Sequence, residues 1–96
     1  MSDRSKQRQL QDIQRRLMAA RESRAVLEEQ VAVWNETLDE ARIRSLVSET
    51  PQLTAEYNEL SKHVLAATTE LARRIQEVQN LTAERDELLR QWVPKG

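Results

Sequence analysis

The sequence predicts an all-α protein in which two long helices pack against each other as an antiparallel coiled-coil hairpin. Three observations predict this fold. Apolar residues recur at alternating spacings of three and four in each half of the chain, the seven-residue period of helices that pack on other helices. Pro51 separates the two apolar stripes. The composition, with 32% charged residues, 3% aromatic residues and one glycine, is typical of long helices.

The first helix is expected to cover about residues 3–49. Ser2 or Ser5 can serve as its N-cap, and no glycine or proline interrupts residues 3–50. We call the row of positions that would face the second helix the seam. In the first helix the seam consists of Leu10, Ile13, Leu17, Ala20, Arg24, Leu27, Val31, Trp34, Leu38, Ala41 and Ser45.

The second helix is expected to cover about residues 51–92, after a turn at about 49–52 and before a frayed tail at 93–96. Proline disfavours helical geometry in the residue before it but is tolerated at the first position of a helix, so Thr50 is the expected N-cap. This seam consists of Leu53, Tyr57, Leu60, Val64, Ala67, Leu71, Arg74, Val78, Leu81, Arg85, Leu88 and Trp92. Both tryptophans are therefore expected in the core.

The alternative to a hairpin is one continuous helix that pairs with other chains. That arrangement would place Pro51 in the interior of a helix, at a cost of about 3 kcal/mol. The sequence therefore favours the hairpin, as a single domain over residues 1–96.

The stripes also predict how the helices are aligned. We expect Leu17 opposite Arg85, Arg24 opposite Val78 and Trp34 opposite Ala67, because a large residue facing a small one favours dense packing. Sliding one helix along the other by half a heptad in one direction would bring Arg24 against Arg74, a clash of like charges. A shift in the other direction would move Trp34 onto Leu71.

A second apolar stripe lies beside each seam and predicts association of hairpins. Helices in bundles show about three apolar positions per heptad, against two in a strict two-helix seam, and this chain falls between these values. Self-association into a four-helix assembly, as a homodimer, or docking on a partner helix is expected. The residues expected between hairpins are Val26, Val33, Ile75 and Leu89.

Charge is distributed unevenly along the chain, although the net charge is only −1. Residues 1–24 carry seven bases and three acids, whereas residues 25–60 carry two bases and eight acids. The hairpin is thus expected to be basic at its open end, with Arg8, Arg15 and Arg16 as candidate contacts, and acidic toward its tip. Asp3 and Asp12 interrupt the basic cluster and no aromatic residues are interleaved with it, which disfavours nucleic acid as a ligand. We expect no membrane contact either.

The sequence offers no arrangement typical of catalysis, cofactor binding or metal binding. His63, the one histidine, lies one helical turn after Glu59, which predicts a surface pair, because a metal site needs further ligands at helical spacing. Paired carboxylates such as Glu36 and Glu40 are expected on a solvated face. With no cysteine and one glycine, thiol chemistry and a glycine-rich phosphate loop are excluded. We therefore expect no enzyme activity, no cofactor and no metal.

Charged residues also occupy the seam itself. Arg24, Arg74 and Arg85 can fix the alignment of the helices, or can extend their charged groups to water while their stems cover the seam. These two roles are compatible with each other.

The segment from Leu27 to Ala41 resembles the hairpin of phage-shock-protein-A-type membrane-remodelling proteins, and it resembles other long antiparallel coiled coils almost as well. No function is transferred from this resemblance. The expected function is a non-catalytic protein–protein interaction module: an adaptor, a chaperone-like holder or a subunit of a complex. The alternative is a regulator of a nucleic-acid or transcription machine that uses the basic end or the acidic tip. The polar N-terminal residues and the lack of a bilayer-length apolar run predict a cytoplasmic location.

Overall fold

The computed structural model describes residues 2–92, and side chains from residue 4 onward. This part of the chain forms two long helices, α1 (Ser2–Ser48) and α2 (Pro51–Trp92), and contains no strand. The all-α class with two long helices is confirmed. Ser5 lies inside α1, so it is not the N-cap of that helix. The frayed tail predicted at 93–96 lies outside the described residues.

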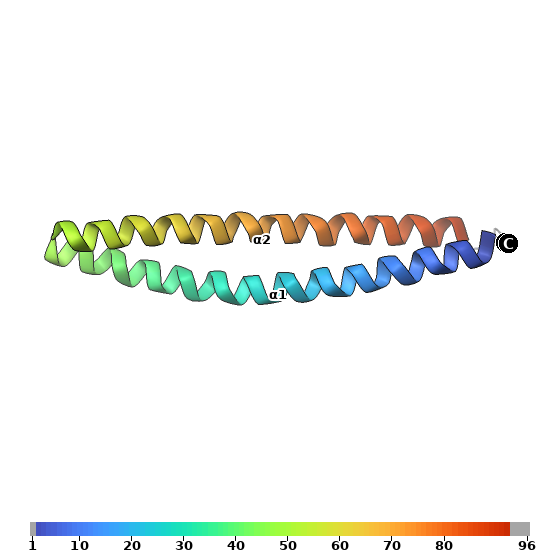
Figure 1. Cartoon of the computed structure of the whole chain (residues 1–96), viewed down its shortest axis with the longest axis horizontal. Coiled ribbons are helices and arrows are strands. Elements are labelled where there is room, and N and C mark those ends of the chain that lie inside the picture. The colour runs from blue at the N-terminus through green and yellow to red at the C-terminus, as the bar shows by residue number, and fades with distance from the viewer. Residues whose placement is uncertain (1, 93–96) are drawn as a thin grey trace. The chain divides into compact units, whose positions relative to one another are not determined.

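The turn between the helices follows from three adjacent residues. Glu49 adopts a φ of 48°, and its N–H donates to the carbonyl of Ser45 at 3.0 Å, which closes the end of α1. Thr50 then caps α2, because its hydroxyl accepts a hydrogen bond from the N–H of Leu53 at 3.2 Å. Pro51 occupies the first helical position, where its missing N–H costs nothing. Figure 1 shows α1 ending at this turn and the chain running back as α2, a helical hairpin.

The chain packs as two compact units. Unit 1 combines residues 1–24 with residues 73–96, and unit 2 consists of residues 25–72. Each unit therefore contains one segment of α1 and one segment of α2. The candidate surfaces described below belong to one unit or the other.

The core of unit 1 is a cluster of buried apolar side chains. Leu17 and Ala20 from α1 pack with Val78 and Leu81 from α2, and Leu17 is 0% exposed. Leu88 is also buried. In unit 2 the buried side chains are small: Val31, Ala41 and Val64. All eight buried residues of the described chain belong to the two seams that the heptad pattern predicts.

The predicted alignment of the helices is wrong by about one helical turn. Leu17 clusters with Leu81 and Val78 rather than facing Arg85, and Ala20 rather than Arg24 accompanies Val78. This is the alignment that we disfavoured because it brings Arg24 and Arg74 to the same level. The objection fails because both arginines are only half-buried and Arg74 Nη1 lies 3.5 Å from the carboxylate of Glu77, which offsets its charge. The alignment instead brings Leu17 and Ala20 together with Val78 and Leu81.

Trp34 in unit 2 is the exception to the predicted seam burial. Its side chain is 40% exposed, and its ring stacks on His63, not in the predicted position opposite Ala67. The residue of α2 beside Trp34 is thus His63 rather than Ala67, a displacement along α2 of about one helical turn. A bulky indole at a seam between only two helices cannot be enclosed on every side, so part of it stays in contact with solvent. Trp92, at the end of α2 in unit 1, is half-buried.

Candidate interaction surfaces

An open apolar groove of about 750 Å³ lies along unit 1. Its apolar lining comes from both helices: Leu10 and Met18 from α1, and Leu89 from α2. Leu89 belongs to the second stripe that the sequence predicts, and it follows the buried Leu88 by one position. Met18 likewise follows the buried Leu17 by one position. Because the helices are antiparallel, these neighbours of seam residues fall on the same flank of the pair.

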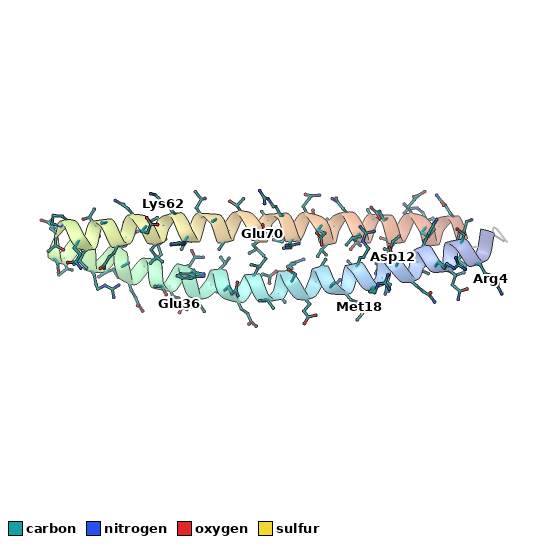
Figure 2. The ribbon with its side chains drawn as sticks, in the orientation of Figure 1. Arg4, Asp12, Met18, Glu36, Lys62 and Glu70 are labelled. Carbon is teal, nitrogen blue, oxygen red and sulfur yellow. The ribbon has the colours of Figure 1, made fainter. Side chains whose placement is uncertain are left out.

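Met18 is the most prominent side chain of the groove. It is 65% exposed, although it directly follows Leu17, which is 0% exposed. Figure 2 shows Met18 projecting from α1 on the side away from α2. A thioether with three rotatable bonds adapts readily to a partner surface. The groove therefore offers an accessible and adaptable apolar contact.

Two arginines border this groove, and each has an aspartate beside it. Arg15 Nη2 lies 2.7 Å from Asp12 Oδ1, and Arg85 Nη2 lies 3.1 Å from Asp86 Oδ1. Arg16 reaches the other oxygen of Asp12 at 3.7 Å. The side chain of Arg15 is 79% exposed. An exposed pair such as Arg15–Asp12 contributes only about 0–1 kcal/mol, so Arg15 can exchange its partner at little cost. Arg85 is more buried, at 26% exposed.

A second hollow of unit 1 is polar. It is lined by charged and amide side chains that include Arg16, Glu77 and Glu84. Near the end of α2, Arg90 donates hydrogen bonds to the carboxylate of Glu87, one of them from Nε at 3.1 Å. This hydrogen bond, together with the positive charge of Arg90, holds the pKa of the exposed Glu87 carboxyl below its ordinary value. A further hollow beside Glu87 has Ile13 and Leu88 in its lining, but at about 450 Å³ it is smaller than the groove.

Unit 2 carries a row of exposed valines on α1, which we call the valine stripe. It consists of Val26, Val33 and Val47, which are spaced by multiples of seven and therefore lie along one face of the helix. Val33 is 62% exposed and Val47 is 79% exposed. Glu40 interrupts the stripe. The stripe is open to solvent in the single chain.

Exposed glutamates accompany the valine stripe. Glu29 and Glu36 are each three residues beyond a valine, so they lie next to the stripe at the same seven-residue spacing. Figure 2 shows Glu36 pointing away from α2. The stripe therefore has an acidic border, whereas the groove of unit 1 has a basic one.

His63 forms two contacts in unit 2. Its Nε2 lies 3.8 Å from Glu59 Oε1, which confirms the predicted surface pair. Its ring also stacks on Trp34, with ring centroids 6.4 Å apart and an angle of 22° between the planes. This stack was not expected from the sequence, because the predicted alignment placed Ala67 opposite Trp34.

The residues predicted as contacts divide between the two units. Val26 and Val33 lie exposed in unit 2, whereas Ile75 is half-buried and Leu89 borders the groove in unit 1. Arg8, Arg15 and Arg16 are exposed in unit 1. Leu10, Met18 and Arg85 were not predicted as surface contacts. For Met18 the available signal was its neighbour, because it directly follows the buried Leu17, just as Leu89 directly follows the buried Leu88.

Within the described residues, no three histidine, cysteine or acidic side chains are grouped so that they could hold a metal ion. Neither α1 nor α2, over its described residues, has a stretch apolar enough to cross a membrane. Comparison with family models, curated proteins and solved structures found no match for this chain. The fold defines an all-α helical hairpin, and its exposed apolar surfaces are its candidate sites.

Proposed function

We propose that this chain is a non-catalytic protein–protein interaction or assembly module that acts through its helical faces. The observation that carries the proposal is the presence of large apolar side chains that stay exposed at helical spacing outside the seams, chiefly the valine stripe. Such a stripe is typical of a helix that packs on a further helix. The groove beside Met18 offers a second surface of the same kind in unit 1. An adaptor, a chaperone-like holder and a complex subunit all use such surfaces.

The preferred form of this proposal is self-association of hairpins into a four-helix coiled-coil assembly, with a homodimer as its simplest product. Two helices that each show a second apolar stripe can cover it by pairing with two more helices. The expected cytoplasmic location stays a prediction, which subcellular fractionation can test.

The test is the oligomeric state of a variant in which Val33 and Ile75 are both replaced by glutamate. We expect the wild-type chain to associate and the double variant to become monomeric, because each change places a charge on an apolar contact. Light scattering at several concentrations measures the state, and circular dichroism should show that the helices persist. A control with Gln30→Glu and Gln76→Glu adds the same charge at exposed positions in the same two units and should associate normally.

Two outcomes count against this proposal. A wild-type chain that remains monomeric at every concentration would contradict self-association. A gel shift with nucleic acid that weakens as salt is added, and that is lost when Arg8, Arg15 and Arg16 are changed to glutamate, would instead favour the nucleic-acid alternative.

A further inference from the structure

The two exposed apolar surfaces of this chain have borders of opposite charge. The groove of unit 1 is bordered by Arg15 and Arg85, whereas the valine stripe of unit 2 is bordered by Glu29 and Glu36. The difference extends to the whole units. Unit 1 contains twelve basic and seven acidic residues, and unit 2 contains three basic and nine acidic residues. Their formal net charges are therefore +5 and −6.

We propose that the groove of unit 1 binds the valine stripe of unit 2 from a second copy of this chain. This inference rests on the proposed function and identifies the surfaces that meet. Val26 and Val33 of one copy would cover Leu10, Met18 and Leu89 of the other. The apolar contact supplies the affinity, and the charged borders select the partner surface and speed its approach.

The spacing of the charges supports this pairing. Arg8 and Arg15 are exposed and one heptad apart on α1, so they lie about 10.5 Å apart along the helix. Glu29 and Glu36 are also exposed and also one heptad apart, and Val26 and Val33 share that spacing. Arg15, which lines the groove, and Arg8, one heptad before it on α1, can thus meet the two glutamates beside the stripe at the same time.

The charges disfavour the simpler contact between two grooves. Two copies of unit 1, each with a formal net charge of +5, would repel each other as they approach. An approach of unit 1 to the oppositely charged unit 2 is attractive. Arg15 can take part because its pair with Asp12 is exposed and weak, so exchanging Asp12 for a partner carboxylate costs little.

The proposed contact joins two different surfaces of the chain, so one copy can offer the groove while another offers the stripe. This property allows a mixing experiment that a contact between identical surfaces would fail. Met18→Glu blocks the groove and leaves the stripe intact, whereas Val33→Glu blocks the stripe and leaves the groove intact. Both positions are more than half exposed, so both variants should keep their helices.

We expect each variant alone to associate at least tenfold more weakly than the wild type in analytical ultracentrifugation. An equimolar mixture should recover association, because the groove of the Val33→Glu chain can still bind the stripe of the Met18→Glu chain. Association of the wild type should weaken as salt is added, since opposite charges are being screened. Met18→Leu, which keeps an apolar side chain of similar volume, should associate within about threefold of the wild type.

Three results would overturn the inference. The first is a mixture that associates no better than the separate variants. The second is a Val33→Glu chain that associates normally while Met18→Glu does not, which would indicate a contact between two grooves. The third is association that strengthens with salt. If one of these occurs while the wild type associates and the double variant Val33→Glu with Ile75→Glu is monomeric, the proposed function stands and only this pairing is wrong. A wild-type chain that stays monomeric would contradict both the proposed self-association and this pairing.

Discussion

At the scale of single residues, the turn contains the clearest local conflict between sequence and structure. Glu49 adopts a left-handed backbone conformation with a φ of 48°. This region favours glycine, because a side chain there crowds the following carbonyl oxygen. The chain tolerates the strain because the N–H of Glu49 closes the end of α1 and the next residue, Thr50, caps α2.

Replacing Glu49 by glycine should therefore stabilise the protein. Relief of the left-handed strain, about 1–2 kcal/mol, exceeds the entropy that glycine loses, about 0.5–1 kcal/mol, so the expected gain is about 0.5–1 kcal/mol. Urea denaturation followed by circular dichroism measures this gain. Glu49→Ala is the matched control and should change the free energy of unfolding little, because alanine keeps the crowding Cβ atom. A glycine variant that unfolds at lower urea would show that Glu49 makes a compensating contact.

At the scale of the helices, adjacent residues of α1 have opposite environments. Leu17 is fully buried in the core of unit 1, and Met18 projects into the open groove. The helical period explains this contrast, because one step along the helix turns a side chain by about 100°. The seam residue Leu17 thus contributes to the folding of unit 1, while its neighbour Met18 is available to contact a partner.

Alanine substitutions at these two positions should separate folding from association. Leu17→Ala should lower the free energy of unfolding by about 2–3 kcal/mol, near the low end for buried leucines, because a two-helix core can partly collapse around the gap. Met18→Ala should change the stability of the isolated chain by no more than about 0.5 kcal/mol, as expected of an exposed position. Denaturation at concentrations too low for association measures both. Equal losses at the two positions would contradict the assigned burial.

At the scale of the whole molecule, the sequence divides its charge between two units of opposite sign. Such a distribution affects the rate and selectivity of association more than the stability of the fold. The exposed basic residues Arg8, Arg15 and Arg16 belong to unit 1. Their exposure makes them suitable for a test that leaves the cores intact.

Reversing Arg8, Arg15 and Arg16 to glutamate should slow association while leaving the helical content unchanged. The association rate of the wild type should fall as salt is raised, because salt screens charges beyond about 8–10 Å, whereas the reversed variant should lose this dependence. Stopped-flow fluorescence of Trp34 and Trp92 can follow the rate. Normal association of the variant at low salt would show that the basic residues play no part, and attention should then move to Glu36, Asp39 and Glu40.

Much of the fold could be predicted because helices that pack together impose a period on the sequence. The heptad stripes predicted two long helices and included every residue found to be buried, and Thr50-Pro51 predicted the position of the turn. The candidate contacts were predicted less completely. Val26, Val33 and Leu89 were named from their positions beside the seam, but Met18 and Leu10 were not placed on the same groove.

The alignment of the two helices was decided only by the tertiary structure. Antiparallel stripes with a seven-residue repeat can slide by one turn and still match apolar residues with apolar residues, so the pattern alone leaves several alignments open. We chose among them by avoiding a meeting of Arg24 and Arg74, but both arginines are only half-buried and Arg74 has the carboxylate of Glu77 beside it, which offsets the repulsion. The sequence by itself determined the helices, the turn and the seam residues, because these depend on local geometry and period. The packing of whole side chains across the seam decided the alignment, and with it the stacking of Trp34 on His63 and the groove beside Met18.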